Sequence, residues 1–151
     1  MRSNELDKTV ALWRAANLAR GRPDDGMRLA RVREKLLEAS ATTYVAVSPH
    51  VVGMVLLEPG RIDNGDGPID PDLLHISMLF VDPSEQRTGV ATALLRHVFG
   101  RAVAQGFSRV TLWTAKDNEP AQRLYESVGM TPARPDQPGP ISEHLQYECR
   151  L

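Results

Sequence analysis

The sequence lacks most of the features that mark specialised classes of protein. Its 151 residues include one cysteine, Cys149, which excludes an internal disulfide and every zinc pattern built on several cysteines. Two Trp, three Tyr and three Phe are too few to favour an aromatic platform for stacking bases. No apolar run approaches the roughly 18 residues of a membrane-spanning helix. This absence predicts no membrane partner, and because 18 Lys and Arg almost balance 19 Asp and Glu, we expect no nucleic-acid partner.

What remains is the composition of an ordinary globular protein, with 42% hydrophobic and 25% charged residues. This length is enough for one domain whose core needs no disulfide or structural metal, so we expect residues 1–151 to form a single domain. The first nine residues alternate charged and polar side chains without the apolar run of a secretory leader, which favours a cytoplasmic location.

Apolar residues at helical spacing predict four helices. The first covers residues 4–20, and the second follows a proline and two aspartates at residues 23–25, which suit a helix start. The clearest helix covers residues 89–105 and is followed by Gly106, a natural helix-ending residue. A short helix begins after Asn118 and stops at Gly129.

Runs rich in β-branched residues predict five strands, at residues 44–47, 51–57, 73–81, 109–114 and 141–149. The first two strands form a hairpin with a turn at residues 48–50. Loops are expected at residues 58–72, which hold three prolines and three glycines, and at residues 131–140, which hold four prolines. The strand–helix–strand unit over residues 73–114 is normally a crossover between parallel strands.

Residues 81–95 carry the most informative pattern, a strand that leads through a polar turn into a helix. The first amides of a helix have no partner within it, and the helix dipole adds partial positive charge, so this helix start favours an anion such as phosphate. Gly89 allows close approach of the backbone, and Ala91 keeps the same surface low. A plain strand–helix connection is the alternative, whereas a Walker A loop and a dinucleotide-binding glycine triad are both absent from the sequence.

Two motifs on these elements resemble those of the GNAT superfamily of N-acetyltransferases. The segment Val81-x-Pro83-x-x-Gln86-x-x-Gly89-x-Ala91 resembles the family's binding motif for the pyrophosphate of acyl-CoA. The segment Asn118-Glu-Pro-Ala-x-x-x-Tyr125-Glu-x-x-Gly-Met resembles its second motif. The resemblance covers about residues 44–130, and the first two helices and the last strand fit by order only. It implies an α/β fold in which helices flank a mixed, mostly antiparallel sheet whose central parallel pair splays into a V.

The resemblance also implies acetyl-CoA as cosubstrate and no metal. Main-chain amides from Arg87 to Thr92 would cradle the pyrophosphate, and the splayed strand would offer main-chain groups to the pantetheine arm. The residues implied in binding the coenzyme are Leu79, Phe80, Val81, Gln86, Arg87, Thr88, Gly89, Val90, Ala91, Thr92, Asn118 and Tyr125. The four histidines are scattered along the chain and give no separate sign of a metal site.

Acyl transfer from a thioester to an amine needs a base for the amine, donors for the oxyanion and a proton for the thiolate. The family commonly places a tyrosine near the coenzyme sulfur, and Tyr125 holds that position; packing of its helix onto the sheet is the other interpretation. His75 stands where some members carry a catalytic glutamate, so it is the candidate base, with Glu58 in reserve and an ordinary core histidine as the alternative. The candidate oxyanion donor is the N–H of Leu79 or Phe80.

The implied reaction is direct attack by a primary amine of a small molecule or peptide. Asp63, Asp66, Asp70 and Asp72 would attract a cationic amine, and a solvated acidic loop is the alternative explanation for them. Two other functions stay open: an acyl-CoA-binding regulatory module without catalysis, and an acyltransferase with a longer acyl chain or an oxygen acceptor. A homodimer is compatible with a small enzyme of this kind, but the sequence does not locate its interface.

Overall fold

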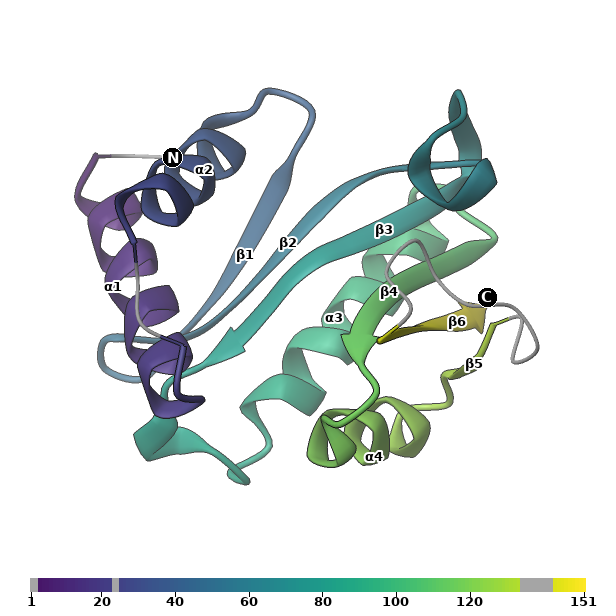
Figure 1. Cartoon of the computed structure of the whole chain (residues 1–151). Helices are drawn as coiled ribbons and strands as arrows, with labels where there is room; N and C mark the ends of the chain where they lie inside the picture. Colours follow the sequence, from purple (N-terminus) through teal and green to yellow (C-terminus); the bar gives the residue numbers. More distant parts are fainter. Residues whose placement is uncertain (1–2, 23–24, 134–142) are drawn as a thin grey trace. The chain divides into compact units, whose positions relative to one another are not determined.

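A computed structural model describes residues 3–22, 25–133 and 143–151 of the chain. The strands form a mixed sheet in the order β1-β2-β3-β4-β6-β5, which confirms the predicted α/β architecture. Two short 3-10 helices, η1 and η2, lie before β3 and α3. The elements are α1 (Ser3–Ala19), α2 (Gly26–Leu37), β1 (Thr42–Val47), β2 (Val51–Arg61), η1 (Asp63–Gly65), β3 (Ile69–Val81), η2 (Pro83–Glu85), α3 (Val90–Ala104), β4 (Arg109–Ala115), α4 (Glu119–Ser127), β5 (Thr131–Pro132) and β6 (His144–Arg150) (Figure 1).

Backbone contacts divide the chain into two compact units. The first comprises Met1–Leu57 and Met78–Leu94, and the second comprises Glu58–Ser77 and Leu95–Leu151. Strands β2 and β3 and helix α3 each contribute one end to each unit. The expectation of a single domain over residues 1–151 stays a prediction.

The first unit is built on an apolar core between two helices and a hairpin. Strands β1 and β2 pair antiparallel, with Tyr44 opposite Val55, as the sequence predicts. Asp25 caps α2 by accepting a hydrogen bond of 2.7 Å from the amide of Arg28. In Figure 1, α1 and α2 lie next to each other on the same side of β1. The core side chains are Leu6, Val10, Leu12, Trp13, Val32, Leu36, Met54 and Leu56.

One glycine of β2 brings the start of α3 close to the sheet. A Cβ built at Gly53 would lie 2.7 Å from Cγ1 of Val90 and 3.0 Å from Cδ1 of Leu94. Both contacts are closer than side chains normally approach, so a larger residue would force the side chains of Val90 and Leu94 to shift. Gly53 therefore helps to fix the position of the loop that precedes α3.

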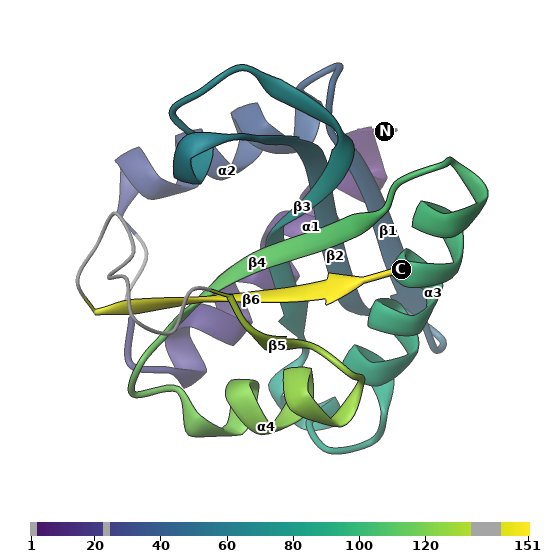
Figure 2. The same cartoon turned by 90° about the vertical axis from the view of Figure 1, so that its right-hand side faces the viewer.

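The second unit centres on β4. This strand pairs parallel with β3 and antiparallel with β6, and β6 in turn pairs with the short β5. Figure 2 shows β4, β6 and β5 next to one another, with α4 alongside β5. Val110, Leu112 and Tyr147 are almost fully buried, as are Tyr125 of α4 and Met130 just beyond it. Helix α4 is thus held to these strands by large apolar side chains.

The predicted loop over residues 58–72 is wrong in its extent. Strand β2 continues to Arg61 and β3 already begins at Ile69, so only residues 62–68 separate them. The amide of Ile62 donates to the carbonyl of Pro68 at 3.1 Å and closes the hairpin. A Cβ at Gly60 would collide with the side chain of Leu73, so this glycine allows close packing across the strands. Such packing outweighs the turn preference of proline and glycine here.

The C-terminal predictions also need correction. Strand β6 covers His144–Arg150 rather than residues 141–149, and residues 141–142 lie outside the described residues. The predicted loop at residues 131–140 begins with a strand, because Thr131 pairs with Glu148 and Pro132 with Tyr147. Residues 134–140 lie outside the described part of the chain.

Candidate functional site

The parallel pairing of β3 with β4 is short. It joins Leu73–Ile76 of β3 to Arg109–Leu112 of β4, although β3 continues to Val81 and β4 to Ala115. The last five residues of β3, Ser77–Val81, therefore lie beyond the parallel ladder. This end includes the amides of Leu79 and Phe80, the candidate oxyanion donors. Phe80 packs against the core of the first unit, so Leu79 points to the opposite face by strand alternation.

The register between β2 and β3 is irregular. The amide of Asp82 donates to the carbonyl of Val52 at 2.8 Å, and the amide of Ile62 donates to the carbonyl of Pro68. These two bonds are ten residues apart along β2 but fourteen residues apart along the opposing segment. An antiparallel ladder keeps equal spacing on both strands unless one of them bulges. Gly53 lies near Phe80 and Gly60 near Leu73, which are seven residues apart on both strands, so most of the extra residues lie between residues 68 and 73.

Strand β3 leads into a loop held by its own hydrogen bonds. The carboxylate of Asp82 accepts hydrogen bonds from the hydroxyl of Ser84 at 2.7 Å and from its amide at 2.9 Å. These bonds, the hydroxyl one first, lower the pKa of Asp82. The hydroxyl of Thr88 donates to the carbonyl of Glu85 at 2.5 Å. The loop before α3 therefore has a defined course.

The backbone at the end of this loop forms a cradle suited to an anion. Arg87 and Gly89 have positive φ values of 64° and 89°. The first bond of α3 is donated by Ala93 to Gly89, so the preceding amides of the helix start have no partner within the helix. No atom outside the immediate chain lies within 4 Å of a Cβ built at Gly89, which leaves open space beside it. Left-handed turns and free helix-start amides together make an anion-binding concavity.

This geometry fits the coenzyme expected from the sequence. Residues 86–92 form one continuous segment, and Gln86, Arg87, Thr88 and Gly89 are exposed. Val90, Ala91 and Thr92 are partly exposed in the first turn of α3. The predicted cradle residues thus lie together at one helix start of the first unit. The main-chain amides and the positive end of the helix dipole at this position favour a pyrophosphate.

In the second unit, the candidate base has a hydrogen-bond partner on the neighbouring strand. His75 of β3 lies opposite Thr111 of β4, and its Nδ1 lies 2.9 Å from the Thr111 hydroxyl. Thr111 is buried and His75 is partly exposed. With the imidazole proton on Nδ1, Nε2 carries the lone pair that a general base needs. The contact holds the ring in one orientation and is compatible with both interpretations of His75.

Glu58, the reserve candidate for the base, already accepts a hydrogen bond. The hydroxyl of Ser77 donates to Oε2 of Glu58. Ser77 and His75 stand two residues apart on β3 and therefore share one face of the strand. Glu58 and Ser77 thus form a second polar pair on the same unit.

The candidate acid lies on α4 beside a second tyrosine. Tyr125 is 8% exposed, and its ring centroid lies 5.7 Å from that of Tyr147 at an interplanar angle of 54°. The hydroxyl of Tyr147 donates to Oε1 of Glu126 at 3.1 Å. Burial, and then the bond to Glu126, raise the pKa of Tyr147. Tyr147 therefore packs against Tyr125 while its own hydroxyl is fixed in a protonated state.

Asn118 has the role of a helix cap. Its Oδ1 accepts a hydrogen bond of 3.3 Å from the amide of Ala121, and Pro120 follows in the first turn of α4. The cap fixes where α4 begins and hence where Tyr125 lies along the helix.

Three neighbours of the candidate site were not predicted from the sequence: Thr111, Ser77 and Tyr147. Thr111 and Tyr147 stand at buried positions of β4 and β6, where a polar group needs a partner. The only signal in the sequence is a polar residue within an apolar strand. The identity of the partner depends on strand register, which the sequence does not reveal.

The acidic residues of the β2–β3 segment are partly engaged. Asp70 accepts a hydrogen bond of 2.9 Å from the amide of Asp72, and it lies 4.0 Å from Arg109. Asp63, Asp66 and Asp72 are exposed. The structure therefore leaves only part of this group available to attract a cationic amine.

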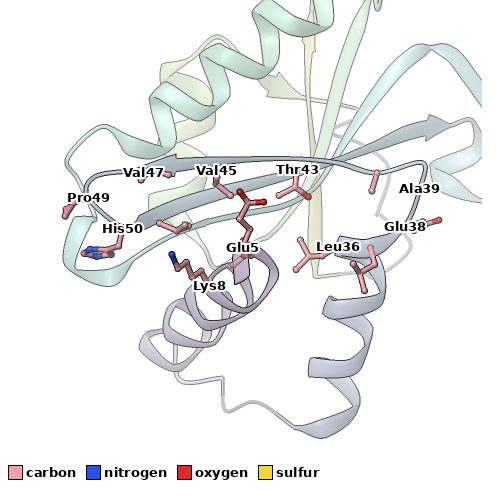
Figure 3. A pocket seen from close by; sticks show the side chains of 14 residues that line it. Glu5, Lys8, Leu36, Glu38, Ala39, Thr43, Val45, Val47, Pro49 and His50 are labelled. Carbon is pink, nitrogen blue, oxygen red and sulfur yellow. The ribbon is translucent and has the colours of Figure 1, made fainter. Parts of the chain in front are cut away.

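A groove with a volume of about 580 Å³ lies in the first unit, and its lining side chains are drawn in Figure 3. The groove is lined by residues of α1, the end of α2 and the segment after it, β1, the turn after β1 and the first residue of β2, and by none of the residues predicted for the active site. Among the described residues, no cluster of three or more His, Cys, Asp or Glu side chains is suited to hold a metal ion. No helix in the described part of the chain is both long and apolar enough to cross a membrane.

The sequence matches the profile of a family described as the acetyltransferase (GNAT) family over residues 9–130. N-acetyltransferase 8 from Homo sapiens is 38% identical over 95 residues, which cover 62% of this chain and 40% of that protein. Probable N-acetyltransferase family 8 member 5 from Mus musculus is 32% identical over 101 residues, which cover 67% of this chain and 43% of that protein. The chain thus spans less than half the length of these curated relatives.

Solved structures of low sequence identity share the fold. The GNAT domain of S. lividans PAT superposes with a TM-score of 0.77 at 15% identity, over 100% of this chain and 88% of that chain. PaiA N-acetyltransferase from Thermoplasma acidophilum, solved in complex with coenzyme A, superposes with a TM-score of 0.75 at 12% identity, over 100% of this chain and 96% of that chain.

Proposed function

Since the chain belongs to the GNAT family of acetyltransferases, we propose that it transfers the acetyl group of acetyl-CoA to a primary amine of a small molecule or peptide. The observation that carries this proposal is the backbone cradle before α3, where Arg87 and Gly89 take positive φ and the first helical amides lack partners within the helix. This cradle suits the pyrophosphate of the coenzyme. Among the relatives, one neighbour of the same fold was solved with coenzyme A.

Binding of the coenzyme is assigned to the first unit. The amides from Arg87 to Thr92, except that of Thr88, which donates to the carbonyl of Glu85 at 3.4 Å, hold the pyrophosphate. The main chain of Leu79–Val81 lies along the pantetheine arm. When bound, acetyl-CoA supplies an activated thioester. The amide of Leu79 or Phe80 donates to the carbonyl oxygen as negative charge develops on it, which lowers the barrier to attack.

Proton transfer is assigned to the second unit. His75 accepts the proton of the attacking amine at Nε2 while Thr111 holds the ring through Nδ1. The hydroxyl of Tyr125 donates a proton to the departing sulfur. The chain's own thiol is a poor nucleophile, because burial raises the pKa of Cys149. Direct attack by the amine therefore fits this chain better than a covalent enzyme intermediate.

The proposal is tested by mixing the full chain with acetyl-CoA and a panel of amines while free thiol is measured. The panel comprises polyamines, aminoglycosides, amino acids, peptide N-termini and lysine peptides. We expect thiol release that depends on one class of amine and a product whose mass is increased by one acetyl group. A parallel panel of longer acyl-CoA donors and of alcohols separates this function from the other acyltransferases.

Binding of acetyl-CoA without turnover on any acceptor would contradict catalysis and would identify a regulatory module. Turnover that prefers a longer acyl chain or an alcohol would contradict the proposed donor or acceptor.

A further inference from the structure

The groove in Figure 3 combines an edge strand with exposed apolar side chains. Strand β1 stands at one end of the sheet order, and among the described residues it pairs only with β2. Its outer edge therefore carries backbone groups that can pair with another strand. Val45 and Val47 are 39% and 62% exposed, and Leu37 at the end of α2 is 59% exposed. All three line the groove.

The two ends of the groove carry charged side chains of opposite sign. Glu38 follows α2 and lies near the N-terminal end of β1. At the other end of the strand, Figure 3 places Lys8 of α1 beside Pro49 and His50. The groove thus has an acidic end at Glu38 and a basic end at Lys8, and Glu5 and Thr43 lie between them together with apolar side chains.

An antiparallel pairing of β1 with the same strand of a second copy matches both features. A two-fold axis perpendicular to the sheet places the same sheet face of both copies on the same side. Residues whose side chains point to that face therefore stand opposite each other across the axis. With the axis at Val45, this valine faces Val45 of the second copy, and Thr43 faces Val47 of the second copy. The same axis places Glu38 at the end that carries Lys8 of the second copy.

We propose that the edge of β1 and the adjacent groove form the interface of a homodimer. Pairing would extend the sheet through β1, cover Leu37, Val45 and Val47, and join each acidic end to a basic end. This inference does not depend on the proposed catalytic function, because none of the groove residues belongs to the predicted active site.

The proposal is tested by sedimentation velocity of the full chain across a range of concentrations. We expect reversible dimerisation, and Val45→Lys should shift the chain to monomer because the two introduced charges would face each other at the axis. Val103→Lys is the matched control, since Val103 is 59% exposed on α3 and lies outside the groove. It should leave the dimer unchanged.

Charge exchange tests the orientation of the two copies. Glu38→Lys should weaken dimerisation about fivefold, the size expected for an exposed ion pair, and Lys8→Glu in the same chain should restore it. High salt should reduce the difference between these variants.

Crosslinking tests the same interface without relying on a variant that could reduce the stability of the chain. In a Cys149→Ser background, Val45→Cys should form a disulfide-linked dimer under mild oxidation, and Val103→Cys should not. A chain that stays monomeric at all concentrations would overturn the proposal. So would a dimer that Val45→Lys leaves intact while Val45→Cys fails to crosslink, because another surface would then form the interface.

Discussion

At the residue scale, the assignment of proton donor to Tyr125 can be separated from its contribution to packing. The ring is buried against Tyr147, so Tyr125→Phe keeps the packing and removes only the hydroxyl. We expect kcat to fall about tenfold or more with little change in the Kd for acetyl-CoA. Steady-state kinetics and isothermal titration measure the two quantities.

The neighbouring tyrosine supplies a matched control for that variant. Tyr147→Phe removes the hydroxyl that donates to Glu126 and should cost about 1 kcal/mol of stability while kcat stays within about twofold. If Tyr125→Phe turned over at the wild-type rate, Tyr125 would have a packing role only.

His75 leads to a prediction in the pH profile. A general base acts in its neutral form, so kcat/KM should rise with pH through an ionisation between about pH 6 and 8. His75→Ala should remove this ionisation. Thr111→Val, which removes the partner of Nδ1, should lower kcat/KM and retain the ionisation, because the imidazole itself is still present. A profile unchanged in His75→Ala would assign the base to Glu58 or to water.

The roles of single residues could be predicted from the sequence only in part. Glycine, proline and capping residues act through local geometry, so the cap at Asn118 and the cradle at Arg87–Thr92 were within reach. The partner of His75 on β3 comes from β4, and the partner of Tyr125 on α4 comes from β6. Their identity depends on the registers His75–Thr111 of β3 with β4 and Leu112–Tyr147 of β4 with β6, which no local pattern encodes.

At the scale of elements, the helix starting at Val90 carries the clearest test of the coenzyme site. Gly89→Ala places a side chain at φ 89° and should cost about 1 kcal/mol of stability. It also fills the open space of the cradle, so we expect the Kd for acetyl-CoA to rise at least tenfold. Chemical denaturation and isothermal titration measure the two effects.

The other end of the same helix offers the matched control. Gly106 has a φ of 87° and equally open surroundings, so Gly106→Ala should cost the same stability and leave coenzyme binding unchanged. Equal affinities for the two variants would contradict the assignment of the cradle.

Elements with strong periodicity were predicted well, and those decided by packing were not. Helices α1, α2, α3 and α4 all lie where apolar spacing places them, with ends shifted by a few residues. The outer part of the β2–β3 hairpin, residues 58–61 and 69–72, was predicted as a loop because its prolines and glycines favour turns locally. Contact between Gly60 and Leu73 across the two strands is a non-local effect, and it determines the result.

At the scale of the whole molecule, the proposed binding of acetyl-CoA should be measurable as a gain in the stability of the folded chain. A ligand that binds only the folded chain stabilises it by mass action. Acetyl-CoA at about one hundred times its Kd should therefore add about 2.7 kcal/mol, which raises the Tm by about 5 to 10 °C for a chain of this size.

The choice of ligands makes this measurement specific for the coenzyme. ATP and NAD carry pyrophosphate groups but lack the pantetheine arm and the thioester, so at equal concentration they should raise the Tm much less than acetyl-CoA. Gly89→Ala should reduce the acetyl-CoA shift, whereas Gly106→Ala, compared with its own unliganded Tm, should retain it in full. Because differential scanning fluorimetry needs no acceptor, the result does not depend on which amine is the substrate. Equal shifts from all three ligands would mean that the cradle binds pyrophosphate in general, and the chain would then lack the selectivity that an acetyl-CoA-dependent enzyme requires.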